Sequence, residues 1–198
     1  MHDQIVNTLH QVATEHQVRI LLAVESGSRA WGFASENSDW DVRFIYVHQP
    51  EWYLSVESHR EVIEAMLPGD LDLAGWELRK ALRLFYKSNP PLLEWLRSPI
   101  TYQQDDEVLH RWRELIPDYC SKERCMAHYL SMASGNVKDY LGREQIPLKK
   151  YLYILRPLLA CRYIERMAPW APMEFSVLVE SCVDNLALKE AIYSLIEK

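Results

Sequence analysis

Two hydrophobic periodicities occur along the chain, and the change between them divides it near residue 100. Apolar residues at positions 5, 9, 12 and 13 have helical spacing and predict an amphipathic helix over 3–16. Short β-branched apolar runs predict buried strands. These strands are expected at 18–25, 41–47 and 71–76. The stretch 60–67 fits a strand or a helix, and 48–59 reads as a loop.

Helical spacing dominates the rest of the chain. Pro90 and Pro91 cannot continue the helix expected at 77–87, but they suit the start of the next one, with Asn89 as its cap and Glu94 as a structural acid paired with Arg97 or Lys80. Further helices are expected at 106–117, 122–141, 147–167, 173–183 and 185–197. We therefore predict an α/β or α+β domain over 1–100 and an all-helical domain over 101–198, joined around "SPITYQQDD".

Composition narrows the class of protein. The net charge of −6 argues against a protein that coats nucleic acid through bulk electrostatics. We find neither an apolar run long enough to span a membrane nor a signal peptide. The four cysteines, at 120, 125, 161 and 182, fit no zinc motif. We expect a cytoplasmic protein with reduced thiols.

Charge is unevenly distributed along this acidic chain. Residues 122–166 hold 9 basic and 4 acidic side chains, whereas residues 1–100 hold 9 basic and 14 acidic. A local basic surface facing an acidic site would suit a polyanionic substrate beside bound metal. A solvated helical face explains the same pattern equally well.

The stretch "GSRAWGFASENSDWDVRFIYV" (27–47) carries the candidate chemistry. Gly27 and Ser28 turn a strand into a short helix, which would present backbone N–H groups and a hydroxyl to a phosphate. Asp39 and Asp41 lie two residues apart, so their carboxylates point to one face of a strand, about 6–7 Å apart. Two such acids repel each other unless a cation lies between them.

A third acid would complete a two-metal phosphoryl-transfer site. Asp72 lies between Leu71 and Leu73 in a candidate strand and faces away from both, and we expect it to face Asp39 and Asp41. Asp70 is the rival for this role, and we take Asp72.

These motifs together resemble the DNA polymerase β nucleotidyltransferase superfamily. With "DLAGWELRKALRLFYKSNPPLLEWLRSP" and "KKYLYILRPLLACRYI", the chain is more narrowly similar to predicted bacterial nucleotidyltransferases associated with RNA repair. The resemblance implies a nucleotidyltransferase-type N-terminal domain with a small mixed sheet and a helical C-terminal domain. It also implies that Gly27 and Ser28 hold nucleotide phosphates, while Asp39, Asp41 and Asp72 bind Mg²⁺ or Mn²⁺.

The helical half offers a second group of candidates. Lys149, Tyr153 and Arg156 have the spacing of one helix face, with Lys150 beside it. Taken with the resemblance, this stripe is expected to contact the triphosphate or an RNA backbone. The other interpretation is that the side chains of the basic residues cover packed leucines.

The implied reaction moves a nucleoside monophosphate from an NTP to an acceptor hydroxyl and releases pyrophosphate, without a covalent enzyme intermediate. RNA is the favoured acceptor, while a protein hydroxyl or a small molecule such as an aminoglycoside stays open. A non-catalytic sensor or scaffold that binds NTP and metal is the competing class. The sequence leaves the oligomeric state and the preferred base undetermined.

Overall fold

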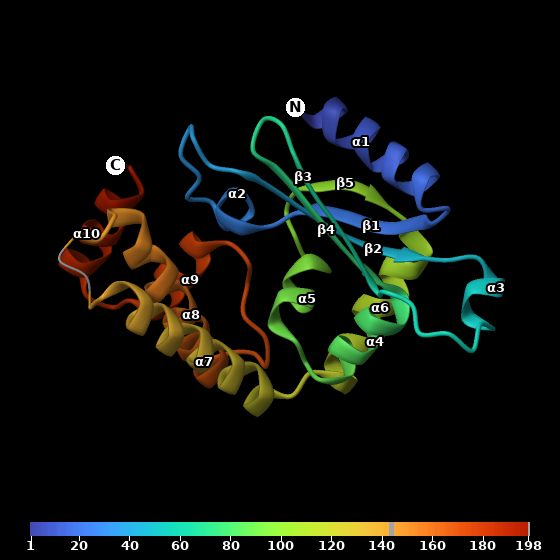
Figure 1. The fold of residues 1–198 in the computed structure, drawn as a ribbon. Helices are drawn as coiled ribbons and strands as arrows, with labels where there is room; N and C mark the ends of the chain where they lie inside the picture. Colours follow the sequence, from blue (N-terminus) through green and yellow to red (C-terminus); the bar gives the residue numbers. More distant parts are fainter. Residues whose placement is uncertain (143–144, 198) are drawn as a thin grey trace.

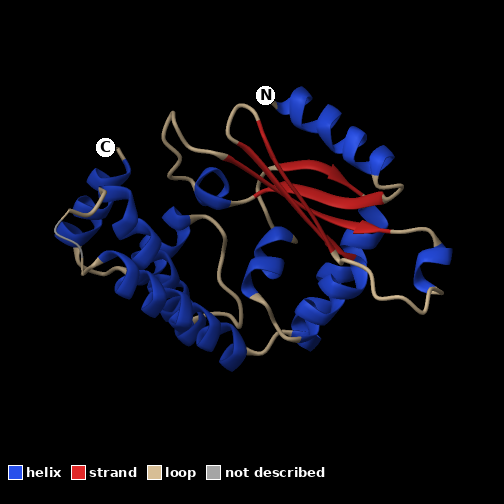
Figure 2. Ribbon diagram, viewed as in Figure 1, coloured by secondary structure: helices blue, strands red, loops and turns tan. Residues whose placement is uncertain are grey.

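Five strands form one mixed sheet in the order β3-β4-β2-β1-β5 (Figures 1 and 2). This computed structural model describes residues 1–142 and 145–197. The strands are β1 (Arg19–Glu25), β2 (Trp40–Val47), β3 (Val62–Leu67), β4 (Leu71–Glu77) and β5 (Thr101–Gln104). Neighbouring strands are antiparallel except for β2 and β4, which run parallel. The parallel pair therefore starts at a common edge of the sheet.

Helices cover both faces of this sheet and form a bundle beside it (Figure 1). On one face lies α1 (His2–Glu15), and on the other lie α4 (Leu78–Tyr86), α5 (Pro90–Trp95) and α6 (Asp106–Tyr119). Two short helices, α2 (Gly27–Trp31) and α3 (Pro50–Tyr53), follow β1 and β2. The bundle consists of α7 (Lys122–Tyr140), α8 (Leu148–Arg166), α9 (Phe175–Cys182) and α10 (Leu186–Ile196).

Strand alternation separates two hydrophobic cores. Val42, Leu71 and Leu73 pack with α1 in the smaller core, so the residues between them point to the opposite face of the sheet. The larger core lies on that opposite face and continues through α4, α5 and α6 into the helical bundle. The acids of β2 and β4 consequently lie on the side of the sheet that faces the bundle.

The predicted fold class is confirmed, and most of the expected elements occur within a few residues of their predicted bounds. The ambiguous stretch 60–67 forms β3, at the edge of the sheet. The sequence prediction missed β5, which pairs with β1. The sheet therefore continues to Gln104, past the domain boundary expected at residue 100. Within the described residues, no helix is long and apolar enough to cross a membrane.

Candidate active site

The turn after β1 brings the backbone of Gly27 directly against Asp41. Gly27 has a φ of +60°, and a Cβ built there would lie 2.0 Å from Asp41 Oδ2. Ser26 N–H donates to the Asp41 carbonyl oxygen over 2.8 Å, which holds the turn to β2. Only glycine permits both the positive φ and this approach. The glycine expected from the motif thus lies beside the second acid of the motif.

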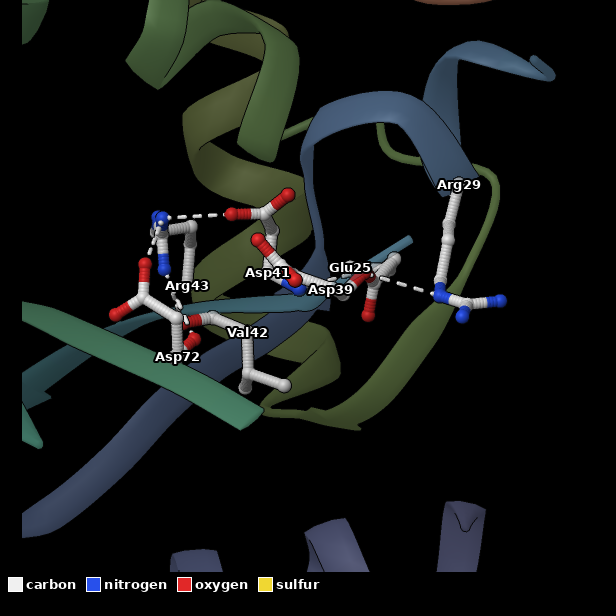
Figure 3. A network of polar contacts seen from close by, with 7 residues as sticks. All are labelled: Glu25, Arg29, Asp39, Asp41, Val42, Arg43 and Asp72. Atoms are coloured by element: carbon white, nitrogen blue, oxygen red, sulfur yellow. Dashed lines mark hydrogen bonds and ion pairs between the residues drawn. The ribbon is translucent and has the colours of Figure 1, made fainter. Parts of the chain in front are cut away.

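Asp41 and Asp72 are partners in the parallel register of β2 and β4, and Arg43 joins them (Figure 3). The Arg43 Nη2 atom lies 3.0 Å from Asp41 Oδ1 and 2.7 Å from Asp72 Oδ2. Its Nη1 atom donates to the backbone carbonyls of Val42 and Asp72. Because four acceptors hold one guanidinium, Arg43 fixes the two carboxylates relative to each other.

Asp70 lies elsewhere, in the turn that joins β3 to β4. It has a φ of +56°, and its carbonyl oxygen accepts from Trp40 N–H over 2.8 Å. Its place in the turn is therefore explained by backbone geometry. The structure brings Asp72, and not Asp70, to the same arginine as Asp41.

Asp39 precedes β2 and is exposed. Arg29 holds the backbone here, since its Nε donates to the Asp39 carbonyl oxygen over 3.1 Å and its Nη2 to that of Ser38 over 2.6 Å. The Arg29 guanidinium also lies 3.8 Å from the centre of the Trp40 ring. Arg29 thus positions the loop that carries Asp39 (Figure 3), and Asp39 itself is exposed.

Glu25 supports the site through hydrogen bonds, and it was not among the residues predicted from the sequence. It is fully buried, and its carboxylate accepts from Asp41 N–H over 2.9 Å and from the Tyr102 hydroxyl over 2.5 Å. Burial raises the pKa of Glu25, although both hydrogen bonds act against this. The sequence does contain a signal for Glu25, because this acid ends an apolar strand immediately before the Gly-Ser turn. Because Tyr102 lies on β5, its hydrogen bond to Glu25 connects β5 to the site.

Lys149 approaches this site from the start of α8. Its Nζ lies 2.5 Å from Ser38 Oγ and 3.4 Å from Ser35 Oγ, in the loop that leads to Asp39. Burial lowers the pKa of Lys149, and the negative charge of Asp39 opposes that shift. An ammonium group from the helical half therefore faces the acids of the sheet.

The other residues of the predicted α8 stripe take different positions. Lys150 lies over the rings of Tyr140 and Tyr153, with its Nζ 4.9 Å from each centre. Tyr153 is half-buried against Trp31, with 5.6 Å between the ring centres. Burial raises the pKa of Tyr153, and the negative charges of Asp41 and Asp39 add to that effect. Tyr153 therefore borders the acidic site.

Arg156 lies inside the protein, with only 2 % of its surface exposed. It forms an ion pair with Glu94 over 2.9 Å, donates to the Met173 carbonyl oxygen, and lies over the ring of Trp31. Glu94 also accepts from Tyr129 and Trp31. Sequence reasoning treated Glu94 as structural but paired it with Arg97 or Lys80. In the structure Glu94 pairs with Arg156 instead. Arg156 is therefore buried and does not lie on the same surface as Lys149.

The acids have the donor chemistry that a divalent metal requires. Within residues 1–142 and 145–197, no group of three or more His, Cys, Asp or Glu side chains is arranged so that it could hold a metal ion, and Arg43 stands between two of the acids. Burial raises the pKa of Asp41, as do the charges of Asp72 and Asp39, and Arg43 does not cancel this rise. The carboxylates therefore favour further positive charge, and Mg²⁺ needs few protein ligands when substrate oxygens supply the rest.

Comparison with known proteins identifies a family for this chain. Residues 1–198 match the family described as "RNA repair pathway DNA polymerase beta family". The chain is 48 % identical over 198 residues to the uncharacterized protein YcgL of Bacillus subtilis (strain 168), which covers all of this chain and 76 % of that protein. A crystal structure of a nucleotidyltransferase-like protein from Exiguobacterium sibiricum 255-15 aligns at a TM-score of 0.38 with 12 % identity, covering 97 % of this chain and 72 % of that one. That structural similarity is too distant to support any argument about function.

Proposed function

Because this chain belongs to the RNA repair pathway DNA polymerase beta family, we propose that it is a metal-dependent nucleotidyltransferase. It would transfer a nucleoside monophosphate from an NTP to an acceptor hydroxyl and release pyrophosphate. The observation that carries this proposal is the pairing of Asp41 with Asp72 across two parallel strands, beside the Gly27 turn. Lys149 adds a cation at the loop that leads to Asp39.

Asp39, Asp41 and Asp72 would hold Mg²⁺ or Mn²⁺ through their carboxylate oxygens. When bound, such ions lower the pKa of an attacking hydroxyl and stabilise the charge on the phosphates. Arg43 would keep the carboxylates of Asp41 and Asp72 in register.

Other side chains of this site would bind and orient the nucleotide. Lys149 would neutralise part of the triphosphate charge, while Gly27 and Ser28 would contact phosphate at the turn. Lys150 and Tyr153 lie at the border of the same site and would contact the rest of the nucleotide. Catalysis would then rest on positioning and charge stabilisation.

RNA is the acceptor that we propose first, because the description of the family names an RNA repair pathway and because residues 122–166 are basic. A cytoplasmic location suits this acceptor and the four free cysteines. A hydroxyl of a protein or of a small molecule is the alternative acceptor. A sensor that binds NTP and metal without turnover is the alternative to a transferase.

The test is transfer of label from each α-labelled NTP in the presence of Mg²⁺ or Mn²⁺. Total RNA, the protein itself and a cell lysate serve as acceptors, so that the labelled product identifies the acceptor class. We expect the Asp39→Ala/Asp41→Ala variant to lose at least about a hundredfold in rate. Asp70→Asn, which removes a negative charge from the nearby turn and suits its positive φ, is the matched control and should keep the activity.

Three outcomes distinguish the alternatives. Label that enters RNA only with the wild type and the Asp70→Asn control supports the whole proposal. Full activity in the double variant contradicts the assigned metal ligands. Metal-dependent NTP binding that needs both acids, without transfer to any acceptor, favours the sensor.

A further inference from the structure

A pocket of about 410 Å³, away from the candidate active site, lies between the two halves of the chain. Its walls come from the end of α5, from α6 and from the segment that joins α8 to α9. They consist of Arg97, Arg113, Ile116, Pro117 and Trp170. The volume falls in the range of small-ligand sites. None of the acids of the candidate active site lines it, and neither does Lys149, so the pocket is a separate feature.

Two arginines, Arg97 and Arg113, line this pocket, and no carboxylate is among its lining residues. Arg113 donates from Nε to the Leu96 carbonyl oxygen over 2.8 Å, and within the described part of the chain its two terminal nitrogens have no hydrogen-bond or ion-pair partner. Arg97 has no ion-pair partner among the described residues. Like charges that share a pocket repel each other, and an anion between them removes that cost. The polar part of the pocket is therefore suited to an anion with several oxygen atoms.

The other walls of the pocket are apolar and partly flat. The Arg97 guanidinium lies 5.6 Å from the centre of the Trp170 ring, and Ile116 and Pro117 lie one turn along α6 from Arg113. An aromatic ring and two aliphatic side chains would accommodate a planar ring through stacking and burial. A simple inorganic anion would leave this surface unused.

We infer that the pocket binds a nucleotide, with its phosphate between Arg97 and Arg113 and its base against Trp170. The shared ligand chemistry is a phosphomonoester next to a flat ring. A free mononucleotide and the 5′-phosphorylated end of an RNA strand both carry this chemistry. The inference is independent of the proposed transferase activity, since no residue of the catalytic site takes part.

The test is isothermal titration of the full-length protein with AMP in EDTA, which removes divalent metal from the catalytic site. We expect Arg97→Gln and Arg113→Gln each to raise the Kd for AMP about tenfold or more, because each loses a charge-assisted contact with phosphate. Arg97→Lys keeps the charge and should lose less. Arg111→Gln removes an exposed arginine from the same helix and should bind AMP like the wild type.

Inorganic phosphate and adenosine measure the two parts of the ligand separately. Each should bind at least about tenfold more weakly than AMP, since each uses only one part of the pocket. A 5′-phosphorylated RNA oligonucleotide distinguishes the sources. Tighter binding than AMP, still dependent on both arginines, identifies the end of an RNA strand, while equal binding identifies the free nucleotide.

Several results would overturn the inference. They are absence of AMP binding, binding that survives both Gln substitutions, and inorganic phosphate that binds as tightly as AMP. Loss of AMP binding in Asp39→Ala/Asp41→Ala would place the nucleotide in the catalytic site instead. The transferase is tested by label transfer, whereas the pocket is tested by AMP binding without divalent metal. Either proposal can therefore fail while the other stands.

Discussion

Two groups of residues were expected to contact the substrate, and only one of them lies together in the structure as expected. Asp41 and Asp72, on parallel strands, lie at one arginine, as their alternation predicts. Lys149 and Arg156 lie on one helix but not on one surface, since Lys149 faces the acids while Arg156 is buried against Glu94. The same kind of spacing argument therefore succeeded on strands and failed in part on a helix.

The difference follows from the geometry of the two elements. A strand has two faces, and buried apolar neighbours decide which face an acid such as Asp72 takes. A helix that is covered on several sides has no single polar face, and α8 packs against both α7 and α9. Whether its arginine is exposed then depends on a partner such as Glu94, which is far away in sequence.

Breaking the buried ion pair tests this comparison with the largest expected effect. Arg156→Met leaves the Glu94 carboxylate buried without its counter-charge, and we expect a loss of about 3–5 kcal/mol in the free energy of unfolding. Urea denaturation measures this loss. The double variant Glu94→Gln/Arg156→Met removes both charges and should be more stable than Arg156→Met alone. If Arg156→Met unfolds like the wild type but binds NTP poorly, Arg156 belongs to the nucleotide site after all.

Much of the fold was predictable because local patterns determine it. Apolar runs identified β1, β2 and β4, and Asn89 caps α5 as expected, accepting from Leu92 N–H over 3.1 Å. The strand β5 was missed because only Tyr102 in "TYQQ" is buried, so its sequence has no hydrophobic alternation. It is held by backbone pairing with β1, which no local pattern reports.

The candidate site was predictable to a similar degree. The Gly-Ser turn and the acids of the strands follow a motif, whereas Glu25 and Arg43 act through contacts made by the folded chain. The bridging role of Arg43 depends on the register of β2 with β4, which connects residues 29 positions apart. The spacing of residues along the chain does not predict this long-range register.

Gly27→Ala tests how closely the turn controls the acids. The added Cβ would collide with Asp41 Oδ2, so we expect nucleotide transfer to fall about a hundredfold as the carboxylate is displaced. Gly32→Ala is the matched control, because Gly32 also has a positive φ, of 86°, but its added Cβ meets nothing within 4 Å. Both variants should lose stability in thermal unfolding, and only Gly27→Ala should lose activity. Equal activity in the two variants would contradict the role assigned to this contact.

Lys149→Met tests the part of the α8 stripe that faces the acids. Loss of an ammonium group near the triphosphate should raise the KM for NTP about tenfold, with a small change in unfolding free energy. Lys150→Met, at the neighbouring position, should change the KM less because Lys150 lies over two tyrosine rings. Steady-state kinetics on both variants decides the point. A larger effect at Lys150 would show that the two lysines have the opposite roles.

The smallest effect concerns the charge of Asp41 itself. Its pKa in the folded protein is raised by burial above the ordinary value of 3.8, so stability is greatest below that pH and falls as the pH rises through the folded pKa. Asp41→Asn should therefore unfold at a slightly higher urea concentration than the wild type at pH 7, with the difference shrinking toward pH 3.5. Asp70→Asn is the control, since asparagine suits its positive φ. Mn²⁺ should reverse the order at pH 7 by stabilising the wild type more than Asp41→Asn. If Asp41→Asn is instead less stable at neutral pH without metal, the carboxylate is a structural partner of Arg43 first and a metal ligand second.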